Sequence, residues 1–438
     1  MLHSKPSPRT ITSRLKQWKQ QKRRKPLLLI SNTAEGVVKV IVDFQSSHFE
    51  DMVVLDLDDI KEHFISIEEP NDVLDKLRLI SGKKIDRERT LVVLKNVNDS
   101  NMVIHLSSLL NQFHRKYSVI FTTDQYGLLN QIEEMEHVQI ELIRSVSFEE
   151  YLKLCSQRCT ATFKHFVNKE EHLIPMKPIF YDSMLDRFLE FVILGGSSTS
   201  VNTYLRNKDL SEITALQGNL LSDFRNKILV NNHSVEGLKM NMIFSLNLQY
   251  KSHYKKFKCN AVREPARART WESSVNKLIS GGYLNRVTTL GGGFKLFHIN
   301  TGFLISQLNI DTLTMIRERQ IPDPVMETFV VNSLLDGGDS ELELVITKTK
   351  NLQPYIWTVA GKRFGVFVGG RYRKRFIQNL IKKHNLDIGI KIGQQNFSIE
   401  DNIVSIPIFF ADHIMKFISK IEKHGNYIPD FKKKYSIY

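Results

Sequence analysis

Residues 25–43 read KPLLLISNTAEGVVKVIVD, and this stretch decides the fold that the sequence predicts. Residues 27–30 form a short apolar run typical of a buried strand, a polar turn follows, and residues 37–44 have the apolar character of a helix. Further apolar runs alternate with helical patterns along the next hundred residues. The strands predicted in this way cover residues 27–30, 52–55, 90–94, 118–121 and 138–142. This alternation favours an α/β unit with a mostly parallel sheet covered on both faces.

The turn after the first strand has the spacing of a phosphate-binding loop, G-x-x-x-x-G-K-[ST], without its chemistry. It is filled as Ser31-x-x-x-x-Gly36-Val37-Val38. In such a loop the lysine contacts the β- and γ-phosphates, and the Ser or Thr hydroxyl binds Mg²⁺. Both of these positions are valine here, at the carboxyl ends of the strands where ligands of parallel sheets bind. We therefore predict that the architecture of an ATPase is kept and its reaction lost.

Composition limits the classes of protein to consider. A chain of 438 residues holds two or three domains, and no apolar run reaches the ~18 residues of a membrane span. The basic N-terminal segment has no apolar core for a secretory signal, and three cysteines fit a reducing compartment, so we expect a cytoplasmic protein. The net charge of +14 favours anionic partners, nucleic acid first, with a solvated basic surface as the alternative.

The rest of the chain changes character twice. Residues 147–231 have helical patterns throughout, with a helix stop at Gly195-Gly196. Residues 270–279 then predict a helix followed by two strands, 283–289 and 294–299, joined by a glycine turn, which is the outline of a winged helix. Strands and helices alternate again from Pro322 onward. We place domain boundaries so that the segments are 1–145, 146–235, 236–305 and 306–438.

Several phrases in this order resemble one known family. They are SVSFEEYLKL (145–154), LEFVILGG, LSEITALQGNLLSDFRNKI, and KLISGGYLNRV with FKLFHINTGFL. The resemblance is to prokaryotic AAA-type ATP-binding proteins. In these a P-loop ATPase domain with a helical lid precedes a winged helix and a C-terminal domain similar to restriction endonucleases. The resemblance implies the same four parts here, with the last as an α/β endonuclease-like domain.

The resemblance also locates the positions that carry ATPase chemistry. It places the family's P-loop lysine at Val37 and its Mg²⁺-binding hydroxyl at Val38. The acidic residues that follow the family's next conserved strand are Lys95 and Asn96 in this chain. The alternative at this position is that Lys95 contacts phosphate from another direction. The implied nucleotide site is therefore a remnant.

The endonuclease-like part shows a similar loss. Nucleases of this class place acidic residues and a lysine around one or two metal ions that activate water. Glu327 fits the family's helical glutamate, and Glu343, within ELELVI, falls at its aspartate. Val366 and Val368 fall at the glutamate and lysine of the next strand, although a shift of one or two residues would change these names. No shift restores the site, because residues 362–370 contain no carboxylate.

Positive charge is the strongest remaining feature. One cluster leads into the winged-helix segment, and Lys277 lies on its predicted recognition helix; a second cluster lies near residue 373, with Tyr372 and Phe376 interleaved. The arginines predicted to contact nucleic acid are Arg263, Arg267, Arg269, Arg371, Arg373 and Arg375. Phosphates attract such clusters, and aromatic rings stack on bases. The alternative is a solvated helix start and a winged helix that serves only packing.

Together these features predict a protein with degenerate ATPase and nuclease sites, no cofactor, and DNA or a protein as its partner. The alternative is an active ATP-binding and ATP-hydrolysing protein that uses Mg²⁺ through atypical residues. A metal-dependent nuclease is a third class, and the missing acidic cluster argues against it. No membrane association is expected.

Overall fold

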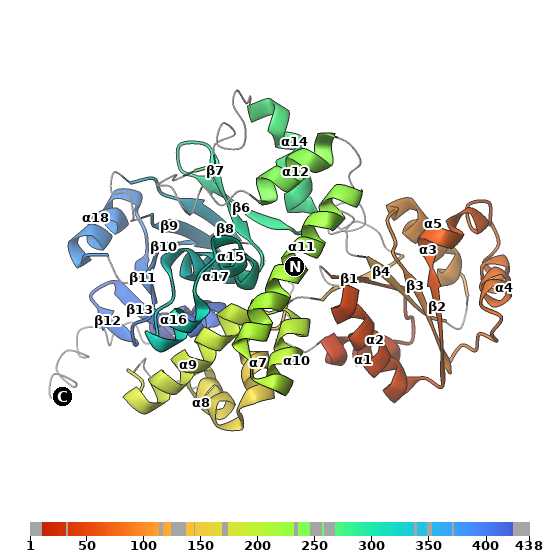
Figure 1. The fold of residues 1–438 in the computed structure, drawn as a ribbon, viewed down its shortest axis with the longest axis horizontal. Helices are drawn as coiled ribbons and strands as arrows, with labels where there is room; N and C mark the ends of the chain where they lie inside the picture. The colour runs from red at the N-terminus through yellow and green to blue at the C-terminus, as the bar shows by residue number, and fades with distance from the viewer. Residues whose placement is uncertain are drawn as a thin grey trace. The chain divides into compact units, whose positions relative to one another are not determined.

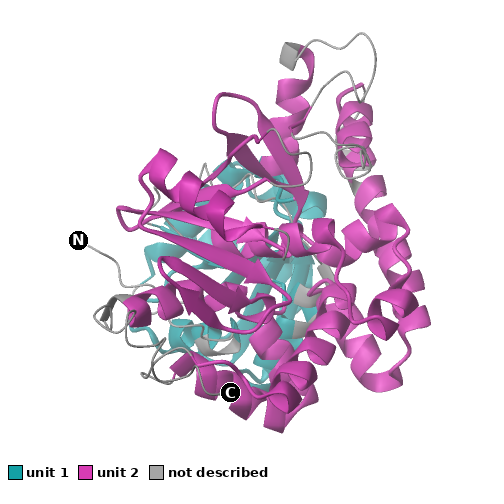
Figure 2. Ribbon diagram, turned by 90° about the vertical axis from the view of Figure 1, so that its left-hand side faces the viewer, with its two compact units in different colours: residues 1–145, 280–282 teal, residues 146–279, 283–438 magenta. Residues whose placement is uncertain are grey.

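The computed structural model describes residues 11–31, 34–113, 117–123, 137–143, 145–168, 174–231, 235–245, 256–257, 268–336, 340–347, 353–369 and 372–423. The chain divides into two compact units, shown in separate colours in Figure 2. Unit 1 comprises residues 1–145 with 280–282, and unit 2 comprises residues 146–279 with 283–438.

Unit 1 is built around a five-stranded sheet (Figure 1). Its strands are β1 (Leu27–Ile30), β2 (Asp51–Asp56), β3 (Thr90–Lys95), β4 (Ser118–Thr123) and β5 (Gln139–Leu142). They lie in the order β2-β3-β4-β1-β5, and every neighbouring pair is parallel. The predicted mostly parallel sheet is therefore confirmed.

Helices cover both faces of this sheet because its central strands are apolar on both sides. Leu27 and Leu29 face α1 (Ile11–Gln20) and α2 (Ala34–His48), in a core that contains Trp18 and Phe44. Leu28 and Ile30 face the opposite core, which contains the apolar residues of α4 (Pro70–Ser81) and α5 (Ser100–Asn111). Two short helices, α3 (Leu57–Ile60) and η1 (Lys61–His63), follow β2.

The strand order creates a topological switch point in unit 1. After β1 the chain passes to β2 at one edge of the sheet, whereas after β4 it passes to β5 on the other side of β1. Open α/β sheets bind ligands outside the carboxyl ends of their strands at such a point. The topology therefore predicts a ligand site at the carboxyl ends of β1 and β4, next to the end of β3.

Unit 2 begins with a block of helices, as the sequence predicts. They are α7 (Phe148–Cys155), α8 (Gln157–Asn168), α9 (Pro178–Leu194), α10 (Ser198–Asn207), α11 (Leu210–Asn231) and α12 (Val235–Phe244). Ser147 and Glu150 form a capping box at the start of α7, and Gly195 ends α9 in the left-handed conformation at φ 64°. Glycine adopts this conformation without the steric cost that other residues meet.

The second sheet has eight strands. The helix and hairpin of the winged-helix segment are α14 (Ala268–Ser280), β6 (Leu284–Thr289) and β7 (Phe294–His298). The later strands are β8 (Ser340–Leu344), β9 (Tyr355–Val359), β10 (Lys362–Val368), β11 (Ile388–Gly393), β12 (Ser398–Glu400) and β13 (Ile403–Pro407). Their order is β12-β13-β11-β10-β9-β8-β6-β7, with both parallel and antiparallel pairs.

The hairpin and the C-terminal strands are one sheet because β6 pairs with β8. Thr288 lies opposite Glu343 and Thr289 opposite Leu344 in a parallel register, and the Leu290 N–H donates to the Leu344 carbonyl at 2.9 Å. The hairpin expected as the wing of a separate winged helix therefore extends the C-terminal sheet.

Helices pack on both faces of this sheet. The remaining ones are α15 (Thr301–Leu308), α16 (Thr312–Arg317), α17 (Asp323–Leu335), α18 (Lys374–His384), η4 (Ile408–His413) and α19 (Ile414–Lys423). The largest core joins α7 to α11 with α17 and one face of the sheet, and α18 covers part of the other face. Segments 236–305 and 306–438 thus share one sheet, and the largest core contains residues of these two segments and of segment 146–235. Within the described ranges, no helix combines the length and apolar composition needed to cross a bilayer.

Candidate functional site

At the carboxyl edge of the first sheet, backbone hydrogen bonds join the ends of three strands. The Ser31 N–H donates to the Thr123 carbonyl at 3.1 Å, joining the ends of β1 and β4. The Val97 N–H donates to the Thr122 carbonyl at 3.0 Å, joining β3 to β4. Ser31, Thr122 and Thr123 are all buried. Backbone hydrogen bonds therefore hold the described ends of β1, β3 and β4 together at the switch point.

The positions predicted to form a P-loop lie in a short connection and a helix. Because α2 begins at Ala34, only residues 31–33 connect it to β1, and Gly36, Val37 and Val38 belong to the helix. Val37 is 5% exposed and packs in the core with Leu15, whereas Val38 is 54% exposed. The turn residues 32 and 33 lie outside the described residues. Val37, which stands at the predicted lysine position, thus packs α2 against the sheet.

Lys95 and Asn96 contact a carboxylate that the sequence analysis did not single out. Asp56, at the end of β2, accepts a hydrogen bond from the Asn96 side-chain amide at 2.5 Å, and the Lys95 ammonium lies 3.6 Å from the same oxygen. Asn96 adopts the left-handed conformation, with φ 57°. Asp56 and Lys95 lie opposite each other in the pairing of β2 with β3, so knowledge of that pairing would have revealed the contact between Asp56 and Lys95.

A second acid–amide pair lies beside the first. Asp58, in the first turn of α3, accepts a hydrogen bond from the Asn98 side chain, and its own N–H donates to Asp56 at 3.2 Å. Asp56 and Asp58 are therefore both bound by side chains of the segment that follows β3. Among the residues that the structure describes, no group of three or more His, Cys, Asp or Glu side chains is arranged to hold a metal ion.

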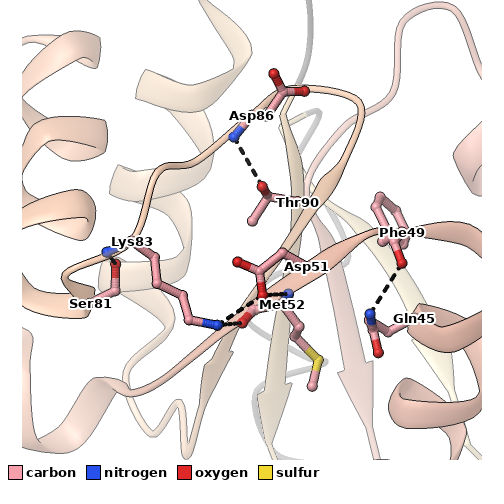
Figure 3. A network of polar contacts seen from close by, with 8 residues as sticks. All are labelled: Gln45, Phe49, Asp51, Met52, Ser81, Lys83, Asp86 and Thr90. Atoms are coloured by element: carbon pink, nitrogen blue, oxygen red, sulfur yellow. Dashed lines mark hydrogen bonds and ion pairs between the residues drawn. The ribbon is translucent and has the colours of Figure 1, made fainter.

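A different polar network stabilises the opposite, amino edge of this sheet (Figure 3). The Lys83 ammonium donates to the Asp51 carboxylate at 2.8 Å and to the Met52 carbonyl at 3.1 Å, at the start of β2. The hydrogen bond from Lys83 is the main cause that lowers the pKa of Asp51. The Asp86 N–H donates to the Thr90 hydroxyl at the start of β3. These contacts hold the strand starts and lie away from the switch point.

Glu327, which the family resemblance predicts to be a remnant of a nuclease site, is neutralised inside unit 2. Both its carboxylate oxygens accept from the Lys295 ammonium, at 2.8 and 2.7 Å, and one also accepts from the Tyr355 hydroxyl. Lys295 on β7 is only 5% exposed, and Tyr355 on β9 is fully buried. Lys295 was not identified from the sequence, because only the folded hairpin brings it to α17.

Glu343 does not share a face of the sheet with Glu327. Leu344, opposite Tyr355, faces the large core next to Glu327, and Glu343, opposite Ile356, points to the face that α18 covers. Val366 is fully buried and lies opposite Tyr355, on the Glu327 side. The structure therefore brings Glu327 and Val366 to one face and leaves Glu343 on the other.

The predicted nucleic-acid residues of the winged-helix segment are only partly described. Arg263 and Arg267 lie outside the described residues, as does the side chain of Arg269. Lys277 is half exposed on α14, with its ammonium 3.8 Å from a Glu236 carboxylate oxygen.

The second basic cluster is better described, although Arg371 lies outside the described residues. Arg373 and Arg375 are exposed at the start of α18. Tyr372 is buried with its ring centroid 5.2 Å from that of Phe367, and burial raises the pKa of its hydroxyl. Phe376 is half-buried and packs against both rings. These aromatic rings are core residues rather than exposed platforms for bases.

No protein-family model matches this chain, and a search of curated proteins finds no match either.

Proposed function

We propose that this protein binds nucleic acid without hydrolysing nucleotide and without cutting the bound strand. In this proposal an ATPase-like and an endonuclease-like fold, both inferred from the family resemblance, serve as scaffolds. One observation carries it: Val37 is buried, and Asn96 and Glu327 are paired internally, in a chain whose net charge is +14.

The nucleotide half of the proposal rests on Val37 and Asp56. A buried valine cannot replace a lysine that reaches β- and γ-phosphates. At the neighbouring strand ends, Asp56 already accepts from Asn96 and lies beside the Lys95 ammonium. A magnesium ion at this edge would have to displace both partners before it could organise an attacking water.

The nuclease half rests on the pair of Lys295 and Glu327. Glu327 is the acid that would ligate a metal, and a buried ammonium already neutralises it. Displacing that ammonium would leave a buried lysine without its counter-charge, which is strongly unfavourable. Since Glu343 points to the other face of the sheet, no second acid joins Glu327 from β8.

The test for nucleotide is a thermal-shift titration of the full chain with Mg²⁺-ATP. A ligand present at ~100 times its Kd would raise the free energy of unfolding by about 2.7 kcal/mol, which such a titration detects. We expect no saturable stabilisation of this kind at millimolar nucleotide. Binding to duplex DNA, measured by fluorescence anisotropy near 50 mM salt, should be detectable and should weaken steeply as salt rises. The duplex should stay intact in the presence of Mg²⁺ or Mn²⁺. Cleavage, or absence of binding near 50 mM salt, would overturn the proposal.

A second candidate function, ATP binding through atypical residues, is favoured by the position of Lys95. Its side chain is 43% exposed at the carboxyl edge, so its ammonium can reach a ligand there. Under this candidate, Mg²⁺-ATP stabilises the protein and Lys95→Ala abolishes the stabilisation. Stabilisation that Lys95→Ala leaves unchanged would argue against Lys95 as the phosphate contact.

A further inference from the structure

The surface of α18 that faces away from the sheet carries cations at helical spacing. Ile377 and Ile381 are buried against the sheet, which places Arg375, Asn379, Lys382 and Lys383 on the opposite side of the helix, all exposed. We call these four residues the outer face of α18. Lys382 follows Arg375 by seven residues, so the two side chains lie almost directly in line along the helix.

The outer face differs from the flank of the same helix. On the flank, the Lys374 ammonium lies 2.9 Å from Asp401 and 3.3 Å from Glu400, and Gln378 donates to Asp401 at 3.4 Å. No ion pair or hydrogen bond of the Arg375, Lys382 or Lys383 side chains is found among the described residues. The segment 373–383 itself contains no acidic residue. The positive charge of the outer face is thus available to a ligand.

Helix stability does not explain this charge pattern fully. Lys382 and Lys383 lie in the last turn of α18, where cations interact favourably with the helix dipole. Arg375 lies in the first turn, where a cation is unfavourable for the same reason. Burial, followed by the charges of Lys383 and Arg363, lowers the pKa of His384 at the end of the helix. The cation at Arg375 therefore has no role in stabilising the helix dipole, unlike Lys382 and Lys383.

We propose that the outer face of α18 binds the phosphate backbone of double-stranded nucleic acid. The distance from Arg375 to Lys383 along the helix is about 12 Å. Duplex DNA carries one negative charge per ~1.7 Å of its axis, so a row of this length meets several phosphates. This inference rests on the proposed function and names its contact surface.

The aromatic residues nearby favour a duplex over a single strand. Single-strand binding depends on bases that stack on exposed rings. The rings beside this surface, Tyr372 and Phe376, pack against Phe367 instead. The exposed groups of the outer face are cationic side chains, which bind phosphates. We therefore expect the contact to be independent of base sequence.

The test compares two variants of the full chain that lose the same charge. The first is Arg375→Gln/Lys382→Gln/Lys383→Gln on the outer face. The matched control is Lys61→Gln/Lys84→Gln/Lys416→Gln, at three exposed lysines elsewhere. Binding to a labelled duplex of random sequence is measured from 50 to 300 mM salt, and thermal unfolding checks that each variant is folded.

For the outer-face variant we expect the slope of log K against log salt to become less negative by about 2.7, because each lost phosphate contact contributes ~0.9. Affinity at the lowest salt should fall about tenfold or more, and the control should keep nearly the wild-type slope. An unchanged slope in a folded outer-face variant would overturn the inference and leave the proposed function standing.

Two further outcomes separate the possibilities. If the wild-type protein does not bind the duplex at 50 mM salt, the proposed function and this inference both fail. If it prefers a single strand of the same length, or binds vesicles containing phosphatidylserine but not the duplex, the surface recognises another polyanion and the assignment to duplex backbone is wrong.

Discussion

Lys295 and Glu327 place two opposite charges in the interior of unit 2, with the ammonium almost completely buried. Removing one partner leaves the other charge uncompensated, which in buried pairs costs about 3–5 kcal/mol. We therefore predict that Lys295→Met lowers the free energy of unfolding by about that amount, measured by urea denaturation. The double variant Lys295→Met/Glu327→Gln should recover more than half of the loss. A loss below about 1 kcal/mol in the single variant would contradict the prediction.

His298 provides a pH dependence of stability. It is fully buried on β7, its ring centroid is 5.2 Å from that of Phe244, and burial, followed by the charge of Arg225, lowers its pKa from 6.5 to about 4. The unfolded chain therefore takes up a proton at a higher pH than the folded chain does. The contribution of His298 to the free energy of unfolding is fully present above about pH 6.5. It falls by about 3 kcal/mol in total as the pH decreases toward 4.

The protein is denatured with urea at several pH values, and the fluorescence of Trp271 and Trp357 reports the unfolding of unit 2. The control is His298→Leu, which cannot take up a proton. The difference in unfolding free energy between wild type and His298→Leu should change by about 3 kcal/mol between pH 7 and pH 4. A difference that is constant across this range would show that His298 titrates normally in the folded protein.

Single residues also mark the limit of prediction from the sequence. The substitutions at Val37 and Val38 could be read directly, because a motif fixes their spacing. Asp56, which binds Asn96, could not be singled out, since that contact depends on which strands are neighbours. The family resemblance predicts that Glu343 lies with Glu327, whereas the alternation of side chains along β8 puts Glu343 on the other face of the sheet.

At the scale of the elements, the end of α9 requires glycine at position 195. Gly195 has φ 64°, and a Cβ atom there would overlap the Asn300 side chain and lie 2.6 Å from the Gly302 nitrogen. Gly82, which ends α4, has the same φ and open space around it. We predict that Gly195→Ala destabilises unit 2 by more than about 3 kcal/mol, from strain and steric overlap.

The matched variant is Gly82→Ala, which meets only the backbone strain and should cost about 1 kcal/mol in unit 1. Calorimetric unfolding of both variants gives the comparison. Equal effects at the two glycines would mean that the contact between the end of α9 and Asn300 relaxes at little cost.

Local patterns predicted most elements well. The strand expected at residues 27–30 is β1 itself, and the other four strands of unit 1 lie within two residues of their predicted bounds. The pairing of β6 with β8 was not predicted, because residues 289 and 344 meet only after the intervening helices fold back. Hydrophobic periodicity predicts which face of a helix or strand is buried, whereas the strand with which it pairs depends on the fold of the whole chain.

At the scale of the whole molecule, the division into two units has a thermodynamic consequence. Each unit has cores of its own, and no hydrophobic cluster among the described residues contains side chains from both. We predict two transitions in calorimetric unfolding. Leu28→Ala should lower the midpoint of one, and Phe188→Ala that of the other, each by removing a buried side chain worth about 2–5 kcal/mol. Both transitions moving together in either variant would contradict independent unfolding.

The parallel pairing of β6 with β8 also determines how the chain can be divided for study. A fragment that ends near residue 305 keeps β6 but loses β8, the strand that covers its edge. That edge would then present unpaired N–H and carbonyl groups to solvent, which favours strand addition between molecules and aggregation. Fragments intended to stay monomeric should therefore keep the hairpin and the C-terminal strands together.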